Sequence, residues 1–405
     1  MMEIEEARER LMEKISPIRD SLMVSARDSF GCIAGGDIKA LQPVPAFNRS
    51  AMDGYAVFSE DIREACEEHP VRLKVRGEIF AGDCKEIEYE KNTAVRIMTG
   101  GMIPDGYDAV VKQEDTDCSE EEVLIKKAVD PYMNYCPAGE EVKEGQTVIP
   151  EGCRIGRAQA GLIAGLGLTE VRIRKPARIA VVSTGSELVK AGIFLKKGKI
   201  YNTISSMLEY SIASYGFETA LCSICNDEEK NMVKEIRKAV RGSDLVITTG
   251  GVSVGKKDLI PDVLNKLGAE VIFKNVNIKP GTPTMASVLE NTVILSLSGN
   301  PFAALANFDV YFGCCAAKLM GSDVFLQVTE EAVLAEPYEK EDSLRRLIRA
   351  KKSGNMVYLP ADSHKASVFG NMTECNCYID LPAGKKISVG DTVNVIKCGV
   401  INEIR

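Results

Sequence analysis

The stretch RIAVVSTGSE (residues 178–187) passes from a continuous apolar run directly into a small polar loop that contains a glycine. Similar apolar runs recur downstream, and segments with helical spacing separate them. A parallel sheet produces this pattern because helices cover both of its faces. The region therefore predicts an α/β domain with a mainly parallel sheet. We expect further strands at about 218–225, 244–251, 269–276 and 291–297, and helices at about 203–215, 227–241, 258–267 and 302–319.

Short alternating runs flank this domain on both sides and predict β structure. Residues 39–174 consist mainly of such runs, broken by glycine, proline and aspartate. Two helices interrupt or precede them, an amphipathic one at 3–15 and a short one at 158–168. The chain after residue 322 again contains short strand-like runs. We expect a small β domain there.

Composition indicates an ordinary folded protein with an acidic balance. The chain has 405 residues, 45% of them hydrophobic, and its 58 acidic and 50 basic side chains give a net charge of −8. This balance disfavours nucleic acid as a partner. No apolar run approaches the roughly 20 residues that a membrane helix needs, and the acidic N-terminus is unlike a secretory signal. We expect a cytoplasmic protein that binds neither nucleic acid nor membrane.

The cysteines and histidines disfavour several kinds of chemistry. The 13 cysteines are scattered without the spacing of a disulfide-rich domain. Cys222 and Cys225 form a C-x-x-C, but zinc would need a second pair or matched histidines. We interpret both as apolar fillers of a strand. With only His69 and His364, a nucleophilic triad is not expected.

Three polar loops follow strands of the predicted sheet: STGSE, TGGVSVGKKD and SGNP. Open α/β sheets bind ligands in the crevice outside the carboxyl ends of their strands. Glycines there let backbone N–H groups approach phosphate oxygens, although a plain tight turn is the alternative interpretation. Glu187 and Asp258 end two of these loops on adjacent strands. Two carboxylates beside a phosphate suit Mg²⁺, so we predict a magnesium site on Glu187 and Asp258.

Three further segments carry polar clusters. IKPGTP fixes Lys279 on a loop that two prolines stiffen. Upstream, FNRSAMDGYAV contains Asp53 and IMTGGMIP contains Thr99, and no helical or strand period explains either segment. The alternatives are a solvated surface lysine for Lys279 and simple turns for the two upstream segments.

Together these motifs resemble one family. FNRSAMDGYAV, IMTGGMIPDGYDAVVKQED, VVSTGSEL, ITTGGVSVGKKD, IKPGTP and LSGNP occur in the order and spacing of the molybdopterin molybdenumtransferases. This is the MoeA family, which includes the E domain of gephyrin. The resemblance covers nearly the whole chain and implies a homodimer. It implies an N-terminal region at 1–175 with two subdomains, of which about 46–145 is a mainly β insertion, a molybdopterin-binding α/β domain at 176–321, and a C-terminal β domain at 322–405.

The resemblance also implies an activity. Family members insert molybdate into adenylylated molybdopterin with the help of Mg²⁺ and release AMP, and a molybdopterin-adenylylating protein is the upstream partner. By motif, the catalytic positions are Asp53, Thr99, Glu187, Asp258 and Lys279, with Glu187 and Asp258 as the metal ligands. The substrate-binding positions share small or polar side chains in the same motifs: Asn48, Ser50, Thr184, Gly185, Gly250, Gly251, Ser253, Gly255, Pro280, Gly281, Pro283, Gly299, Asn300 and Pro301.

Departures from the family pattern concentrate on the anion side. Thr282 stands where K-P-G-K-P has its second lysine, Ala303 replaces a serine, and Asn371 aligns with another serine. The arginine expected in the last domain matches Arg345 or Arg346. These departures leave open a diverged paralogue that binds molybdopterin or its nucleotide without inserting metal. A third reading, an amidohydrolase-like or adenylylating enzyme with the same α/β module, would lack the SAMDGYAV and TGG-x-x-P segments that are present here.

Overall fold

The computed structural model describes residues 1–252, 258–360 and 365–398. Contacts divide the chain into two units, and each is described by itself. The first unit comprises Met1–Gly36, Glu151–Arg157 and Val171–Arg405, and the second comprises Asp37–Pro150 and Ala158–Glu170.

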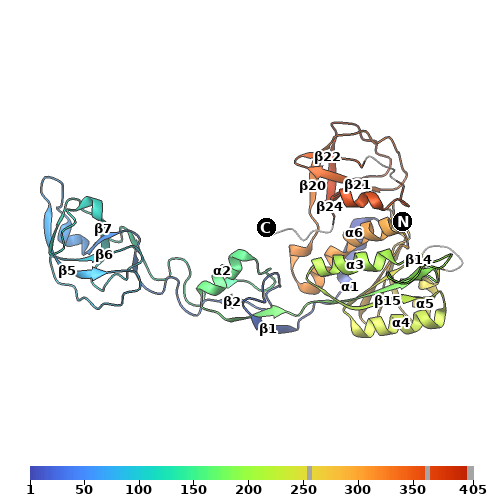
Figure 1. Ribbon diagram of the computed structural model, residues 1–405, viewed down its shortest axis with the longest axis horizontal. Helices are drawn as coiled ribbons and strands as arrows, with labels where there is room; N and C mark the ends of the chain where they lie inside the picture. The colour runs from blue at the N-terminus through green and yellow to red at the C-terminus, as the bar shows by residue number, and fades with distance from the viewer. Residues whose placement is uncertain (253–257, 361–364, 399–405) are drawn as a thin grey trace. The chain divides into compact units, whose positions relative to one another are not determined.

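A six-stranded sheet lies at the centre of the first unit (Figure 1). Its strands are β12 (Arg178–Thr184), β15 (Glu218–Cys225), β16 (Leu245–Thr249), β17 (Glu270–Lys274), β18 (Met285–Leu289) and β19 (Thr292–Leu297). In the order β15-β12-β16-β19-β18-β17, the first four strands run parallel, and β18 pairs antiparallel with both of its neighbours, β19 and β17. The predicted mainly parallel sheet is confirmed. The strand β18 was not predicted.

Helices cover both faces of this sheet, as the sequence predicts. They are α1 (Ile4–Lys14), α3 (Thr203–Ser214), α4 (Glu229–Gly242), α5 (Ile260–Lys266) and α6 (Pro301–Met320). Val181 of β12 packs in one core with α1, α3 and α6, whereas Val182 packs in another with α4 and α5. Consecutive side chains of a strand point to opposite faces, so the two cores lie on opposite sides of the sheet. Figure 1 shows α3 and α4 on these two sides.

The helix α6 corrects one expectation from the sequence. Its 20 residues are apolar enough to span a membrane by length and composition, whereas no run of that kind is expected from the sequence. The helix instead belongs to the core of the protein, since 89% of its most apolar 18-residue stretch is buried. Gly321 follows it with φ +58°, the left-handed conformation in which glycine commonly ends a helix.

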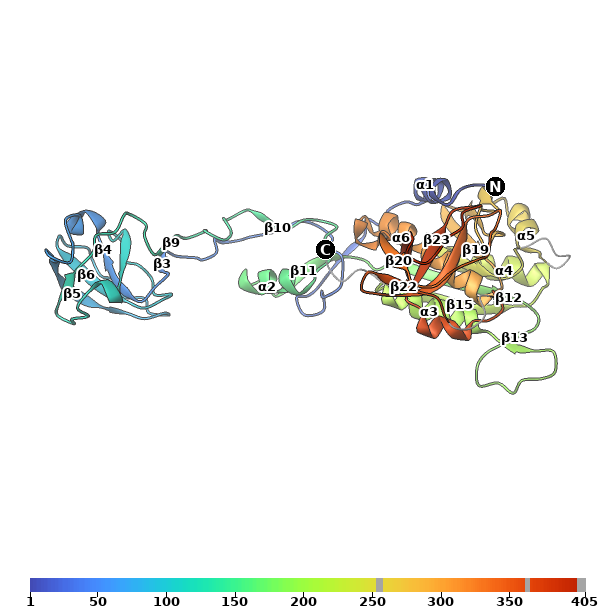
Figure 2. The same ribbon diagram turned by 90° about the horizontal axis from the view of Figure 1, so that it is seen from above.

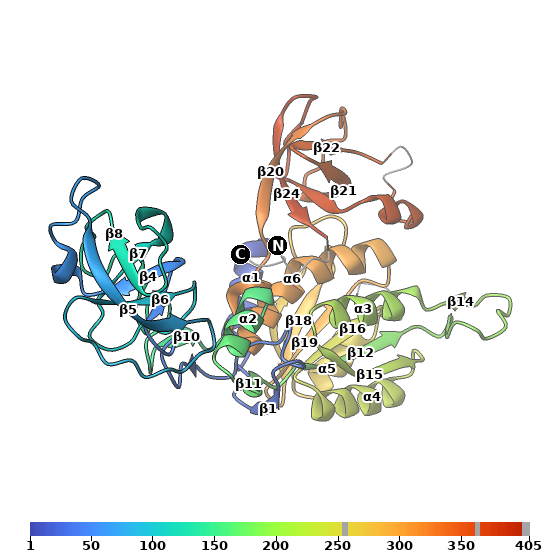
Figure 3. The ribbon, with the colours of Figure 1, turned by 60° about the vertical axis from the view of Figure 1, so that its left-hand side comes forward.

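The predicted C-terminal β domain is a closed barrel that packs on α6 within the first unit (Figure 3). Its strands are β20 (Thr329–Leu334), β21 (Arg346–Ser353), β22 (Met356–Tyr358), β23 (Cys377–Leu381) and β24 (Thr392–Lys397), with 3₁₀ turns η3 (Asp323–Phe325) and η4 (Gly370–Glu374). Ile348 of β21 points into the barrel core, whereas Leu347 joins the core around α6. Alternation along one strand thus fastens the barrel to the α/β sheet.

Two small ladders complete the first unit. In one, β1 (Ser21–Ser25) pairs with β11 (Glu170–Arg174). In the other, β13 (Leu188–Val189) pairs with β14 (Ile200–Tyr201), and Figure 2 shows the connecting loop projecting from the body of the unit.

The second unit is mainly β, as predicted. A five-stranded sheet of order β7-β4-β6-β5-β8 contains β4 (Gly54–Val57), β5 (Val71–Ile79), β6 (Thr93–Ile97), β7 (Ala109–Lys112) and β8 (Glu122–Ile125). Shorter elements accompany it: β2 (Ile38–Lys39), β3 (Arg49–Ser50), β9 (Tyr135–Cys136), β10 (Thr147–Ile149), η1 (Ser59–Ile62), η2 (Gln113–Asp115) and the helix α2 (Arg157–Gly165).

Candidate active site

A cavity of about 370 Å³ lies at the carboxyl ends of β12, β16 and β19, the edge at which the three predicted loops meet. Its volume suits a small-molecule ligand. The start of α3 and the short strand β14 also contribute to its wall. The lining consists of Thr184, Gly185, Glu187, Leu188, Ile200, Tyr201, Asn202, Thr203, Ile204, Asp227, Thr249, Gly250, Gly251, Val252, Asp258, Ser298, Gly299 and Pro301.

The loop after β12 places a carboxylate directly over a glycine. The buried Thr184 hydroxyl donates to the carbonyl of Thr249 at 3.2 Å and so joins the ends of β12 and β16. A Cβ atom added to Gly185 would lie 2.8 Å from the carboxylate oxygens of Glu187. Glycine therefore lets the exposed Glu187 side chain fold back over the backbone at the rim of the cavity.

The loop after β16 depends on two glycines. Gly250 and Gly251 have φ values of +82° and +63°, a region that residues with a Cβ rarely occupy. A Cβ atom at Gly250 would lie 2.6 Å from the carbonyl oxygen of Thr184. The glycines thus bring two loops into van der Waals contact and leave backbone open to the cavity. The predicted Ser253 and Gly255 lie outside the described residues.

Asp227 is a cavity residue that the sequence prediction missed. It follows β15, and its Oδ2 accepts from the Ser186 backbone N–H at 2.9 Å while its own N–H donates to the Ser186 hydroxyl at 3.1 Å. Glu187, Asp227 and Asp258 therefore follow three consecutive strands of the sheet and line the same cavity. The signal was available, because a carboxylate directly after a parallel strand reaches this edge.

Two helices begin at the cavity wall. The first residue of α3, Thr203, and the first of α6, Pro301, both line it. Asn202 and Asn300 cap these helices by accepting N–H groups of Ser205 at 3.1 Å and of Ala303 at 3.0 Å. Helix N-termini attract anions.

The donor set fits Mg²⁺ better than a metal that needs a complete protein cage. Within residues 1–252, 258–360 and 365–398, no three histidine, cysteine, aspartate or glutamate side chains form a group that could hold a metal ion. Mg²⁺ is commonly held by one or two carboxylates together with waters and substrate phosphates. Gly250, Gly251 and Gly299 line the same cavity as Glu187 and Asp258, so backbone without side chains faces the space in which such phosphates would lie.

The loop containing Lys279 does not line this cavity. Its ammonium lies 2.7 Å from Oδ2 of Asp342, which precedes the barrel strand β21. The Thr282 hydroxyl donates to the carbonyl of Ile278 at 2.6 Å, so it serves the loop's own fold. The carbonyl of Gly281 accepts from the buried Asn307 side chain of α6 at 2.9 Å. This hydrogen bond from Asn307 to Gly281 thus fastens the loop to the α/β core.

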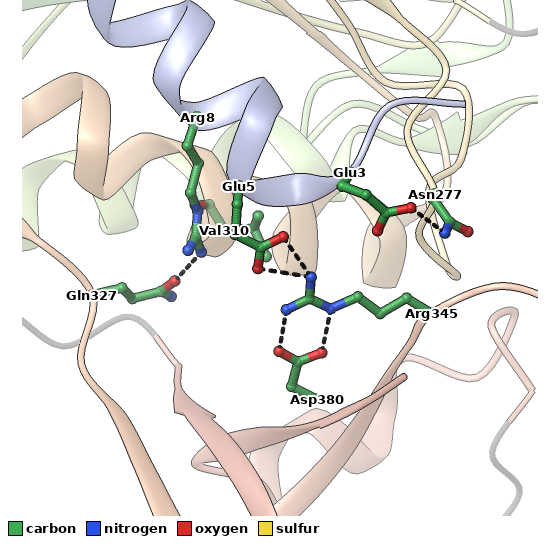
Figure 4. Close-up of polar contacts among 8 residues, drawn as sticks. All are labelled: Glu3, Glu5, Arg8, Asn277, Val310, Gln327, Arg345 and Asp380. Atoms are coloured by element: carbon green, nitrogen blue, oxygen red, sulfur yellow. Dashed lines mark hydrogen bonds and ion pairs between the residues drawn. The ribbon is translucent and has the colours of Figure 1, made fainter. Parts of the chain in front are cut away.

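Both arginines that were matched to the last-domain position are engaged in ion pairs. Figure 4 shows the Arg345 guanidinium between Asp380 of β23, at 2.7 Å, and Glu5 of α1, at 2.8 Å. Arg346 instead donates to Asp342 at 2.8 Å.

A third arginine of the barrel, Arg349, is fully buried at the boundary with α6. Its guanidinium lies 4.0 Å from the ring centroid of Phe302 and donates to Oδ1 of Asn371 at 2.6 Å. The side-chain amide of Asn300 reaches the same region, donating to the carbonyl of Ala366 at 3.1 Å. Asn371 therefore binds an arginine, and Ala303 is a buried residue in the first turn of α6.

In the second unit, Asp53 and Thr99 form one hydrogen-bonded pair. Oδ1 of Asp53 accepts both the backbone N–H and the hydroxyl of Thr99, each at 2.7 Å. These bonds, the backbone one first, lower the pKa of the exposed Asp53. Asn48 accepts the N–H of Ala138 at 2.9 Å, and the Ser50 hydroxyl donates to the carbonyl of Met52 at 2.5 Å. Asn48 and Ser50 thus stabilise the surrounding loop.

Comparisons with known proteins agree with this architecture along the whole chain. Models of the MoeA N-terminal region (domain I and II), a probable molybdopterin binding domain and the MoeA C-terminal region (domain IV) match residues 2–167, 180–313 and 331–398. The molybdopterin molybdenumtransferase of Staphylococcus epidermidis is 34% identical over 397 residues, 97% of this chain and 94% of that protein. The Staphylococcus aureus protein of the same name is 32% identical over 398 residues, with the same coverage. The crystal structure of a molybdopterin biosynthesis MoeA protein from Pyrococcus horikoshii matches with a TM-score of 0.85 and 28% identity, over 98% of this chain and 99% of that one.

Proposed function

This chain belongs to the MoeA family of molybdopterin molybdenumtransferases, transferases of molybdenum cofactor biosynthesis, and we propose that it inserts molybdate into adenylylated molybdopterin with release of AMP. The pterin nucleotide would bind in the cavity of the α/β domain. The diphosphate link to AMP breaks in this reaction, so the site must bind phosphates and stabilise the charge that develops on them.

One observation carries the proposal: a single cavity combines carboxylates with backbone and helix ends that attract anions. Glu187, Asp227 and Asp258 would by themselves repel a diphosphate, whereas the glycine loop and the starts of α3 and α6 would attract it. A divalent cation bound between the carboxylates and the phosphates would remove this repulsion, because it is attracted to both groups. This supports a magnesium-dependent reaction on a phosphate-containing substrate.

The predicted catalytic residues would take the following roles. Glu187 and Asp258 would hold Mg²⁺, which when bound would neutralise charge as the phosphate–oxygen bond breaks. Lys279 would bind an oxyanion, either molybdate or phosphate. Thr99 uses both of its donors on Oδ1 of Asp53, so Oδ2 is the atom that would orient a water or the substrate.

We further propose that the protein works as a cytoplasmic homodimer and receives its substrate from a molybdopterin-adenylylating protein. Each active site would draw Asp53 from one subunit and Asp258 from the other. In a symmetric two-fold dimer both sites are then built in the same way.

The test is a direct assay of purified protein with adenylylated molybdopterin, Mg²⁺ and molybdate, in which AMP and the molybdenum cofactor are measured. Asp258→Asn should lower AMP release by about 10²–10³-fold, the usual loss for one charged contact to a transition state. Asp262→Asn is the matched control, because Asp262 is an exposed acid on the first turn of α5. Equal activity of Asp258→Asn and wild type would refute the metal assignment. A wild-type protein that binds the nucleotide without releasing AMP would instead be the non-inserting paralogue.

A further inference from the structure

The only cation of the IKPGTP loop already has an anionic partner in the protein itself. Lys279 is the single basic residue of this loop, and its Nζ lies 2.7 Å from Oδ2 of Asp342. The lysine side chain is 51% exposed, whereas the aspartate side chain is only 13% exposed. An oxyanion that approaches Lys279 must therefore compete with a carboxylate that the protein holds in place.

Asp342 does not depend on Lys279 for its own position. Its Oδ2 also accepts from the Arg346 guanidinium at 2.8 Å, and its Oδ1 accepts from the Leu344 N–H at 3.4 Å. Arg346 itself is only 16% exposed and lies against the ring of Tyr338, at 5.8 Å from the centroid. Burial opposes ionisation of Asp342, but Lys279, the Leu344 N–H and Arg346 outweigh it and hold the pKa of this carboxyl below its usual value.

The backbone around Lys279 is fixed, although its side chain is exposed. The Lys279 N–H donates to the carbonyl of Arg345 at 2.8 Å, and the Leu347 N–H donates to the carbonyl of Lys279 at 2.9 Å. The Arg345 side chain is in turn held by Asp380 and Glu5 (Figure 4). A lysine ammonium on a flexible four-carbon stem can change partner while its backbone stays in place.

We propose that Asp342 sets the oxyanion affinity of this site by acting as a displaceable counter-ion of Lys279. This inference rests on the proposed function, in which Lys279 binds the oxyanion. On binding, the anion takes the ammonium, and Asp342 keeps its bonds to Arg346 and Leu344. A singly charged anion gains little by replacing a carboxylate of equal charge. The exchange therefore favours tetrahedral oxyanions with two negative charges, molybdate among them, over chloride or formate.

The experiment measures binding of molybdate to the full-length protein by isothermal titration calorimetry. Asp342→Asn removes the competing charge and should tighten molybdate binding about three- to five-fold, the range expected for an ion pair of which one side is solvated. Chloride should then compete more effectively with molybdate than it does in the wild type. Asp342→Ser gives a second variant, because a serine hydroxyl can also accept the Leu344 N–H. Thermal melting establishes that each variant is folded.

Two controls separate this effect from a general change in charge. Glu341→Gln removes the same charge one residue away, from a pair with Lys386 at 3.0 Å in which both side chains are exposed, and should leave affinity unchanged. In a Lys279→Ala background, Asp342→Asn should not tighten molybdate binding. If the wild type binds molybdate and neither Asp342 variant binds it more tightly, the inference is overturned and the proposed function is unaffected. Absence of molybdate binding in wild type and variants alike would overturn both.

Discussion

One buried contact fastens the Lys279 loop to α6, and a pair of substitutions tests it. Asn307 is fully buried, and its Nδ2 donates to the Gly281 carbonyl at 2.9 Å and to the Thr284 hydroxyl at 2.5 Å. Gly281 has φ +94°, and a Cβ atom there would overlap the Asn307 amide. Because that amide is buried and hydrogen-bonded, it cannot move aside without losing its partners.

The two contributions to the cost of Gly281→Ala can be separated. A left-handed backbone costs a residue with a Cβ about 1–2 kcal/mol. Displacing the Asn307 amide leaves buried polar groups without partners, which costs about 1–3 kcal/mol. Gly281→Ala should therefore lower the free energy of unfolding by about 2–5 kcal/mol in the wild type. In an Asn307→Ala background the overlap is absent, and only the backbone cost of about 1–2 kcal/mol should remain.

Chemical denaturation followed by far-UV circular dichroism measures these values, since the chain has no tryptophan for fluorescence. The matched control is Gly268→Ala, whose φ is +79° but whose Cβ would meet nothing within 4 Å. Gly268→Ala should lower the free energy of unfolding by the same amount in the wild type and in the Asn307→Ala background. Equal costs of Gly281→Ala with and without Asn307 would refute the reasoning, because the two sites would then be independent.

Three other predictions concern the anion site, the acid limb of the pH profile and the dimer. Thr282→Lys should tighten molybdate binding, because an ammonium replaces a hydroxyl that already donates within the loop; equal or weaker binding in a calorimetric titration would contradict this. Thr99→Val removes one of two bonds that lower the pKa of Asp53, so that pKa should rise and the acid limb of AMP release should move to higher pH; an unchanged profile would count against a catalytic Asp53. Asp53→Asn and Asp258→Asn homodimers should both be nearly inactive, whereas their purified heterodimer should recover about half the wild-type activity, and no recovery would exclude a shared site.

The sequence predicted the elements whose hydrophobic period is long and regular. The sheet apart from β18, its covering helices and the barrel strands β21 to β24 follow from apolar runs and helical spacing in the sequence, whereas the barrel strand β20 was not predicted. The strand β18 was missed because its hairpin with β19 lacks the usual glycine. The turn to β19 consists of Glu290 and Asn291 with φ values of +51° and +69°, a conformation for which asparagine–glycine is the usual signal.

The cavity was predictable because carboxyl ends of parallel strands share one edge of a sheet. Glu187 and Asp258 were recognised there, whereas Asp227 was assigned to the first turn of the next helix. The partners of Lys279 were not predictable. Asp342 lies in the connection between the barrel strands β20 and β21, and only the packing of the barrel on the α/β domain brings it to the loop.

The pairing of Lys279 with Asp342 bears on the position at which Thr282 stands in place of the family's second lysine. The hydroxyl of Thr282 is engaged within the loop, so in the proposed function the charge of Lys279 would have to supply the attraction for the oxyanion. The other cations of this region, Arg345 and Arg346, are held by acids of the barrel and of α1. In the proposed site, net attraction for an oxyanion would therefore depend on how firmly Asp342 holds Lys279. It follows that a substitution at Asp342 or Arg346 can change affinity for the anion while every family motif stays intact, and that motif comparison by itself does not determine the strength of this site.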